Sequence, residues 1–372
     1  MKICHITTVH PNRYDVRIFE KECSSLAESG FDVTLIVNDE LPDEIKNGVK
    51  IVSLNQAPKN RIDRASRIAR IALKKAIEID ADIYHIHDPE LLQMAIKLKK
   101  RGKKVIFDSH EFTAMQILTK PYLPKFIKKT LSNIYGSYEK KALNKLSGLV
   151  YPCTYKGKDY FDNVNIPKVM VGNYPSKKIL DEVIADCDMT ERQSKVCYVG
   201  GISETRGIFQ MVKGAALAGR KLVLIGEIPI ELKTQLETMP EYEFVECLGK
   251  LPHDIAMKEA ARCAVGLSLL QNQGQYAALD NLPTKLYEYM AIGIPTVVSD
   301  FPYYKKMLEK YKFGIAVDPA DEQAIANAIN EILSNSDLAL EFAEEGNRAI
   351  KEDWNWELHA EKLVRFYKKM MA

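Results

Sequence analysis

No apolar run in this 372-residue sequence approaches the roughly 18–20 uncharged residues that a membrane-spanning helix needs. The first residues, Met1–Ile6, are too short and too polar for a signal peptide and are expected to form a first strand. The seven cysteines are scattered, odd in number and without CxxC spacing, so they do not indicate a disulfide framework. These absences favour a protein of the reducing cytoplasm.

The net charge is also low, +2, but the two halves of the chain carry net charges of opposite sign. Residues 1–170 contain 29 Lys/Arg against 20 Asp/Glu, a balance of +9, and residues 171–372 contain 23 against 30, a balance of −7. Such asymmetry can indicate an acidic partner for the first half. Apolar residues at 46% and charged residues at 27% exclude a disordered or fibrous chain, and the length predicts two or three domains.

Short β-rich apolar runs alternate with helical patterns along the whole chain, which indicates parallel sheets covered on both faces. Two such series predict an α/β protein of two doubly wound domains, with ligands at the carboxyl ends of the strands. We expect an N-terminal domain over 1–172, a C-terminal domain over 173–353, and a final helix over 354–372 that returns to the first domain. The expected strands are 3–7, 33–37, 49–54, 83–86, 105–107, 149–151, 169–171, 196–199, 222–225, 244–248, 265–270, 296–299 and 315–317.

A glycine turn stands between a strand and a helical run at Val199–Gly207. Backbone N–H groups at Gly200 and Gly201 can approach a phosphate there, and the N-terminus of the following helix adds a favourable dipole. Arg206 supplies a permanent cation whose fork geometry suits a pyrophosphate. Taken alone, the segment fits a tight strand–helix turn with a solvated arginine at least as well. It is not the GxGxxG fingerprint, which argues against a nicotinamide enzyme.

The most informative segment, 280–295, places two carboxylates eight residues apart. Asp280 stands in a polar loop and Glu288 inside a helical run, and an extended loop can bring the first toward the helix that carries the second. Glu288 can accept two hydrogen bonds from a ribose diol, and Lys285 can meet a phosphate. The alternative is a solvated helix face with one lysine and one glutamate.

His110 follows the expected strand 105–107, at the carboxyl end where ligands collect. A neutral imidazole can accept or donate one hydrogen bond, and Asp108 or Glu111 can orient it. A metal site of a hydrolase is an alternative for this edge, because His-x-His is a familiar ligand spacing. That hypothesis leaves the glycine turn and the 280–295 segment unexplained; its ligands would be His85, His87, Asp88, His110 and Glu111.

The block Pro283–Asp300 resembles the nucleotide-sugar site of family 4 glycosyltransferases, which have the GT-B fold of two Rossmann-like domains facing across a cleft. The resemblance extends over essentially the whole chain and includes 84–92, 107–111, 198–201 and Trp356. It implies a retaining hexosyl transfer from a nucleotide diphosphate sugar, with no essential metal or other cofactor. The implied acceptor is a glycan or lipid-linked molecule of polysaccharide or lipopolysaccharide synthesis.

The resemblance also implies roles for single residues. The family's Glu-x7-Glu pair appears here as Asp280-x7-Glu288, which places Glu288 on the donor ribose and Asp280 near the transferred sugar, with His110 beside it. The family's two cations after the first strand of the second domain become Gly201 and Arg206, so Lys285 is the candidate for the missing charge. His110, Asp280 and Arg206 are then the catalytic candidates, and the donor set is Gly200, Gly201, Arg206, Asn281, Leu282, Thr284, Lys285 and Glu288.

The family's glycine-rich loop after the first strand is absent, and 10–17 stands there instead. Its charged residues become candidates for the acceptor side of the cleft, although a capped helix start fits them almost as well. The acceptor candidates are Arg13, Asp15, Arg17 and His87.

Residues 91–150 carry 13 Lys/Arg against three acids, and 120–145 mix lysines with aromatic and aliphatic residues at helical spacing. Such surfaces bind anionic membranes at about 1 kcal/mol per Lys/Arg. We therefore expect a cytoplasmic protein, peripheral on the inner membrane face and binding no nucleic acid, since no nucleic-acid motif accompanies the charge. Solvated helix faces are the alternative, and a second basic stripe comprises Arg61, Arg64, Arg67 and Arg70.

Two other function classes remain open from the sequence. A nucleotide-sugar epimerase or hydrolase of the same fold would use the same donor site. A nucleotide-sugar binding protein without catalysis is the other, because one phosphate cation of the family is missing.

Overall fold

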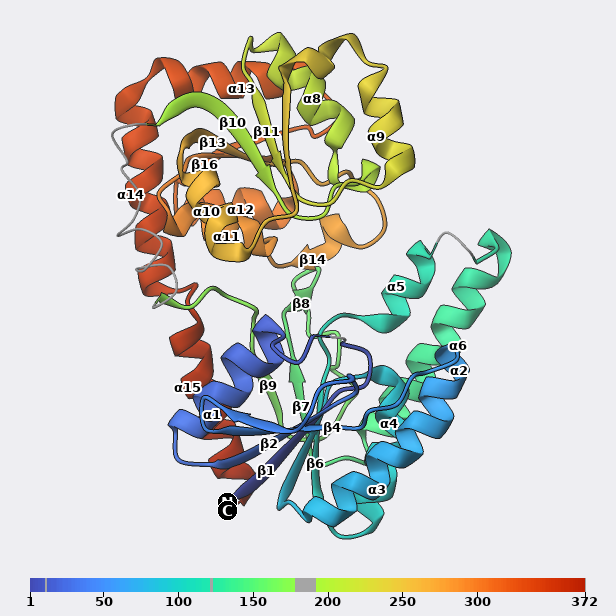
Figure 1. The fold of residues 1–372 in the computed structure, drawn as a ribbon. Coiled ribbons are helices and arrows are strands. Elements are labelled where there is room, and N and C mark those ends of the chain that lie inside the picture. Colours follow the sequence, from blue (N-terminus) through green and yellow to red (C-terminus); the bar gives the residue numbers. More distant parts are fainter. Residues whose placement is uncertain (11, 121–122, 178–191, 372) are drawn as a thin grey trace. The chain divides into compact units, whose positions relative to one another are not determined.

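The computed structural model describes residues 1–372 except 11, 121–122, 178–191 and 372. The chain forms two compact units: Met1–Asn173 together with Trp356–Ala372, and Tyr174–Asn355 (Figure 1). The sequence-based boundaries fall after residues 172 and 353, and the units change after residues 173 and 355. No helix among the described residues is both long and apolar enough to span a bilayer.

The first unit contains an eight-stranded sheet in the order β3-β4-β2-β1-β5-β6-β7-β9. All neighbours are parallel except β3 and β4, which form a hairpin through Asn47 and Gly48, both at positive φ as the tight hairpin turn requires. The hairpin strand β3 was not expected, because it holds a single apolar residue. The strands are β1 (Lys2–Ile6), β2 (Asp32–Val37), β3 (Glu44–Lys46), β4 (Val49–Ser53), β5 (Ile83–Ile86), β6 (Lys104–Asp108), β7 (Gly148–Tyr151) and β9 (Lys168–Met170).

Helices cover both faces of this sheet, as its uninterrupted apolar strands predict (Figure 1). The last helix, α15 (Trp356–Met371), packs against η1 and β9, so the C-terminal segment belongs to the first unit. Its Trp356, Leu363 and Tyr367 join the core around β1 and β2. The other helical segments are η1 (Val16–Cys23), α1 (Ser24–Glu28), α2 (Arg61–Asp63), η2 (Arg64–Ile68), α3 (Ala69–Ile79), η3 (Pro89–Leu91), α4 (Leu92–Lys100), α5 (Thr113–Thr119) and α6 (Lys125–Leu143).

The second unit contains a six-stranded parallel sheet in the order β12-β11-β10-β13-β15-β16. This is the doubly wound order 3-2-1-4-5-6, and its direction reverses between β10 and β13, where ligands of such sheets bind. The strands are β10 (Gln193–Val199), β11 (Leu222–Ile225), β12 (Val245–Gly249), β13 (Cys263–Ser268), β15 (Thr296–Ser299) and β16 (Gly314–Val317). Two-residue strands β8 (Thr154–Tyr155) and β14 (Leu279–Asp280) lie outside the two large sheets.

The two faces of the second sheet are buried under different helices, because successive side chains of a strand point to opposite faces. Tyr198 of β10 lies in the cluster with α8 and α13, whereas Cys197 lies in the cluster with α10, α11 and α12. The helical segments are η5 (Glu204–Arg206), α8 (Ile208–Leu217), α9 (Ile230–Glu237), η6 (Pro240–Phe244), α10 (His253–Ala261), η7 (Tyr276–Ala278), α11 (Thr284–Ala291), α12 (Pro302–Lys310), α13 (Glu322–Ser334) and α14 (Ser336–Glu352).

Candidate functional site

The glycine turn after β10 is held in place by close backbone approaches. Gly200 has φ +119°, and its carbonyl oxygen would lie 2.0 Å from a Cβ at Gly226. Gly207 has φ +77°, and a Cβ there would lie 2.2 Å from the carbonyl oxygen of Leu269. Because L side chains rarely adopt such φ values and have no room at Gly207 or Gly226, glycine is required at these positions. The turn therefore presents bare backbone at the switch point of the sheet.

Two cations converge on this turn. Arg206 Nη1 donates to the carbonyl oxygen of Gly201 at 2.7 Å, and Lys285 Nζ lies 3.7 Å from the centroid of the Tyr198 ring. A Cβ at Gly200 would lie 3.3 Å from Lys285 Nζ and 3.9 Å from Arg206 Nη1. Burial and the charge of Arg206 lower the pKa of Lys285 well below its ordinary value, against the opposing effect of Glu288. Among the described residues no carboxylate lies within 4.0 Å of either cation, so the turn suits an anion.

Helix α11 carries the polar side chains beside these cations. Lys285 stands in its first turn, and Glu288 follows three positions later on the same side of the helix. Glu288 Oε1 lies 2.8 Å from His253 Nε2, at the start of α10. The glycine turn, α10 and α11 together enclose a pocket of about 440 Å³. Its lining residues are Val199, Gly200, Arg206, His253, Leu270, Tyr276, Leu279, Asn281, Leu282, Pro283, Thr284, Lys285, Glu288 and Tyr304.

Most of the predicted donor residues line this pocket. Gly201 does not line the pocket, but its carbonyl oxygen accepts a hydrogen bond from Arg206, which does. Asp280 does not line the pocket either, although its chain neighbours Leu279 and Asn281 do. Asn281 is already held by the protein, because the Tyr287 hydroxyl donates to its Oδ1 at 2.8 Å. Sequence reasoning missed His253, Tyr198, Tyr276 and Tyr304. His253 follows β12 of the same parallel sheet. Its place after the carboxyl end of a strand could have indicated a ligand-binding residue.

A larger hollow of about 530 Å³ lies in the first unit, beside α15. Its lining includes Glu28, Glu357 and Glu361 with a single cation, Arg365. An acidic lining of this kind opposes a diphosphate, so the smaller pocket of the second unit is the better nucleotide site.

The predicted acceptor residues of the first unit are engaged within the protein. Arg13 is 3% exposed, and its guanidinium donates to Asp39, Glu44 and the carbonyl oxygen of Pro42. Asp15 caps η1 by accepting from the backbone N–H groups of Arg17 and Ile18. The alternative of a capped helix start describes these contacts better than a free ligand-binding loop does.

Arg17 and His87 belong to a buried cluster at the switch point of the first sheet. Arg17 Nη2 lies 3.0 Å from Asp108 Oδ1, and Arg17 Nε lies 3.1 Å from Glu22 Oε1. Burial works to raise the pKa of Asp108, but the charge of Arg17 and contacts from histidines outweigh it and hold the pKa well below its usual range. Burial and the charge of Asp108 raise the pKa of Glu22 well above its usual range.

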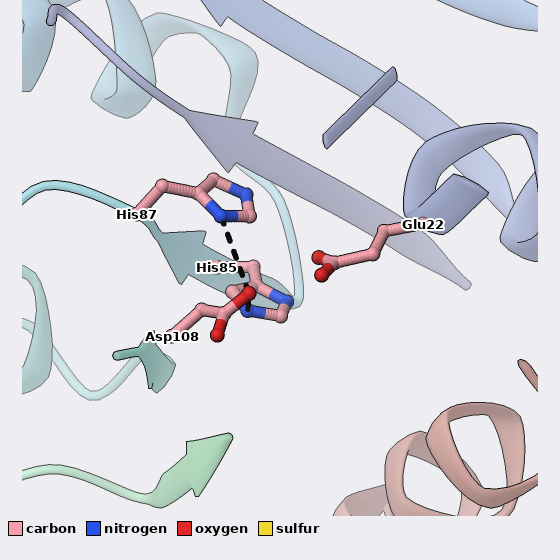
Figure 2. A group of neighbouring side chains, drawn as sticks. All are labelled: Glu22, His85, His87 and Asp108. Atoms are coloured by element: carbon pink, nitrogen blue, oxygen red, sulfur yellow. Dashed lines mark ion pairs between the residues drawn. The ribbon is translucent and has the colours of Figure 1, made fainter. Parts of the chain in front are cut away.

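Of the metal ligands predicted from the sequence, this cluster contains His85 and His87. Ligand atoms of Glu22, His85, His87 and Asp108 lie within 4.8 Å of one another (Figure 2). Asp88, another predicted ligand, instead accepts from Thr7 and Thr8 at the end of β1. The guanidinium of Arg17 pairs with both carboxylates of the cluster and thereby supplies the positive charge that a metal ion would bring.

His110 lies at the outer side of this cluster. Its Nε2 is 3.2 Å from Asp108 Oδ2 and 3.0 Å from His87 Nδ1, and its side chain is 20% exposed. The structure thus brings His110, His87 and Asp108 together at the end of β6, as the strand-end argument predicts.

Comparisons with known proteins agree with this architecture. The model described as Glycosyltransferase Family 4 matches residues 17–171, and the model described as Glycosyl transferases group 1 matches residues 171–349. A phosphatidyl-myo-inositol mannosyltransferase of Mycobacterium leprae is 28% identical over 125 residues, which is 34% of this chain and 32% of the relative's own length. The matched part thus spans about a third of that relative.

Solved structures share the fold over nearly the full length. Sucrose-phosphate synthase from Thermosynechococcus elongatus superposes with a TM-score of 0.77 at 16% identity, covering 100% of this chain and 99% of that one. Anabaena HepE in complex with UDP and glucose gives 0.69 at 13% identity, covering 99% of this chain and all 100% of that one. With two family models placed end to end along the chain and two doubly wound units in the structure, the chain belongs to the family 4 glycosyltransferases and has their GT-B fold.

Proposed function

We propose that the protein is a retaining hexosyltransferase that uses a nucleoside diphosphate sugar and needs no metal or other cofactor. Its acceptor is a glycan or lipid-linked molecule of polysaccharide or lipopolysaccharide synthesis. One observation carries the proposal: Lys285 and Arg206 converge on Gly200 within one pocket that also holds Glu288. A diphosphate and a ribose diol require these groups side by side.

The chemistry follows from where charge develops. As the bond between the sugar C1 and the phosphate oxygen breaks, negative charge grows on the departing diphosphate, and Arg206 and Lys285 oppose it from fixed positions. These two cations supply the neutralisation that a divalent ion provides in other phosphate sites. The acceptor oxygen attacks C1 from the face that the phosphate leaves, and the acceptor proton passes to the phosphate oxygen, so the anomeric configuration is kept.

The names of two similar proteins support the proposed donor and acceptor. The mycobacterial relative is a mannosyltransferase acting with phosphatidyl-myo-inositol, and the Anabaena structure holds UDP and glucose. Both names fit a nucleotide-sugar donor, and the first fits a lipid acceptor. We infer the same classes of donor and acceptor for this chain and a place of action at the cytoplasmic side of the membrane.

Product analysis tests this function against the two other classes. The protein is incubated with nucleoside diphosphate sugars that first pass a thermal-shift screen, with and without lipid-linked acceptors. We expect nucleotide release only with an acceptor, and a product whose anomeric configuration matches the donor by NMR. Consumption of donor without acceptor would indicate a hydrolase or epimerase, and binding without turnover would indicate a non-catalytic protein.

Nucleotide binding is expected to take up a proton at Lys285. Burial and Arg206 lower the pKa of this lysine, and an arriving diphosphate raises it again. Above the lowered pKa, the affinity for UDP or GDP should therefore weaken as pH rises. Titration calorimetry at pH 8 in buffers of different ionisation enthalpy measures the uptake, well above the phosphate pKa of about 6.

The variant Lys285→Met should remove this proton uptake and weaken binding. Lys213→Met is the matched control, because Lys213 pairs with Glu322 outside the pocket. Equal uptake in the wild type and Lys285→Met would assign the proton to a group other than Lys285.

Helix α6 offers a surface for an anionic membrane. Phe126 is 83% exposed and Ile134 is 62% exposed, and Leu131 and Tyr138 are exposed on the same helix. Lysines flank these apolar side chains at both ends of the helix, namely Lys125, Lys128, Lys129, Lys140 and Lys141. An exposed apolar face with basic neighbours is typical of helices that lie in the membrane interface. Residues 121–122 of the predicted 120–145 surface lie outside the described residues.

The second basic stripe contributes less charge than its sequence suggests. Arg64 pairs with Glu90, and Arg67 pairs with Asp63 four positions away. At least two of its four arginines are thus paired with carboxylates, and α6 remains the better membrane surface.

Vesicle flotation tests the membrane surface. We expect recovery with phosphatidylglycerol-containing vesicles that decreases from low to physiological salt, and lower recovery with neutral vesicles, because surface charges are screened by salt. The double variant Phe126→Ser/Ile134→Ser should float less. Ile230→Ser/Leu340→Ser is the control pair, since these side chains are 69% and 59% exposed in the second unit. Equal recovery with neutral and anionic vesicles contradicts the electrostatic part of the proposal.

A further inference from the structure

A chain of hydrogen bonds connects His110 to the last helix within the first unit. It passes through His87, directly after β5, and His5 of β1, and it reaches the hydroxyl of Tyr367 on α15 and then His85 of β5. The contacts are His110 Nε2–His87 Nδ1 (3.0 Å), His87 Nε2–His5 Nδ1 (2.9 Å), His5 Nε2–Tyr367 Oη (3.1 Å) and Tyr367 Oη–His85 Nδ1 (2.5 Å).

Asp108 stands at both ends of this chain. Its Oδ2 lies 3.2 Å from His110 Nε2, within hydrogen-bond distance, and 3.8 Å from His85 Nε2, which makes no hydrogen bond among the described residues. His5, His85, His87, Asp108 and Tyr367 are all 2% exposed or less. Water therefore does not compete for these hydrogen bonds, and the bonded atoms find their partners within the chain of side chains.

Burial sets the protonation of the three inner imidazoles and of Tyr367. Burial lowers the pKa of His5 and His85 well below the ordinary value and that of His87 to about 4, so these rings are neutral near pH 7. Burial likewise raises the pKa of Tyr367 well above its ordinary value, which keeps its hydroxyl protonated. A neutral imidazole carries one N–H and one lone pair. The direction of one hydrogen bond consequently sets the direction of all the others.

Asp108 selects between the two directions. Its ionised carboxylate only accepts hydrogen bonds, so it favours an N–H at the imidazole atom nearest to it, His110 Nε2 at 3.2 Å. The reverse direction would turn the lone pair of His110 Nε2 toward the carboxylate and would serve the carboxylate only through His87 Nδ1, at 3.5 Å. In the favoured direction a neutral His110 carries its proton on Nε2 and a lone pair on Nδ1.

We propose that Tyr367 and His5 are positioning residues that lock His110 in the tautomer protonated at Nε2, so that His110 presents a hydrogen-bond acceptor to a substrate hydroxyl. The part of this inference that concerns the substrate rests on the proposed glycosyl transfer. The tautomer itself does not depend on any activity. The last helix of the chain thereby contributes to the orientation of His110.

The chain of hydrogen bonds is tested first in the wild-type protein by NMR of histidine labelled with 15N. Two-bond correlations from ring nitrogens to ring protons distinguish a protonated nitrogen from an unprotonated one. We expect His5, His85, His87 and His110 all to carry the proton on Nε2. A proton on Nδ1 of His110, or a mixture of its tautomers, overturns the inference whether or not the protein transfers sugars.

The variant Tyr367→Phe then removes the hydroxyl that joins His5 to His85. We expect a mixture of tautomers at His87 and His110 and, if transfer is established, an approximately tenfold lower kcat/KM. Tyr84→Phe is the matched control, because its buried hydroxyl bonds only the backbone at Ala76 and Ala81 of the same unit. An unchanged His110 spectrum in Tyr367→Phe overturns the role of Tyr367. Normal tautomers without any transfer would instead count against the proposed function.

Discussion

Replacing Arg206 with alanine is expected to lower kcat for sugar transfer about 10³-fold while the fold is retained. Arg206 is one of two cations at the glycine turn, and removal of one fixed charged donor from a developing anion costs about 10²–10³ in kcat. Lys285 does not compensate, because its single ammonium cannot reproduce the two parallel N–H groups of the Arg206 fork. Initial rates at saturating donor measure the loss, and circular dichroism confirms folding.

Two further variants separate charge from geometry at this position. Arg206→Lys keeps the charge but loses the second N–H of the fork, so we expect an intermediate rate. Arg262→Ala removes an exposed arginine that pairs with Glu259 on α10 and should leave the rate unchanged. A wild-type rate in Arg206→Ala would show that the diphosphate does not bind at this turn.

Much of the donor pocket is predictable from the sequence because its parts are local. Gly200 and Arg206 lie on one strand–helix turn, and Thr284, Lys285 and Glu288 lie on one helix. The rule that ligands bind at the carboxyl ends of parallel strands then places both segments at one edge of the sheet. The alternation of apolar strands and helices likewise predicts both parallel sheets and their approximate strand bounds.

Contacts between distant segments could not be predicted in this way. The proximity of Lys285 to Gly200, the Tyr198 ring beneath its ammonium and the bond from His253 to Glu288 all depend on how α10 and α11 pack on the sheet. No periodicity in the sequence specifies such a contact. Lys285 was nevertheless a candidate for the missing cation, since its helix was already placed at the donor.

The first unit shows a different limit of sequence reasoning. Arg17 was expected to face a ligand, but it is buried against Asp108 and Glu22. A charged residue in a polar segment gives no sign of a buried partner 91 positions away. Tyr367 and His5 are separated by 362 positions, and only the return of α15 to the first unit brings them together.

Glu288 is the second residue whose loss is expected to have a large effect. A carboxylate that accepts two hydroxyls of the donor ribose makes two charge-assisted hydrogen bonds, each worth about 1.5–3 kcal/mol. Glu288→Ala should therefore lower kcat/KM about 10²–10⁴-fold at 1.4 kcal/mol per tenfold change, and Glu288→Gln should fall between it and the wild type. Steady-state kinetics with the donor identified by the screen measure both.

A donor lacking the ribose 2′-hydroxyl shows whether the effect arises at the ribose. The wild type should use the 2′-deoxy donor at least tenfold less efficiently, since one of the two hydrogen bonds is lost. Glu288→Ala should use both donors equally well, because the partner of that hydroxyl is already gone. His253→Ala is the companion variant: it removes the 2.8 Å contact that orients Glu288 and should lower kcat/KM less than Glu288→Ala. If the 2′-deoxy donor still reduces the rate of Glu288→Ala as it does that of the wild type, the carboxylate acts on another part of the donor.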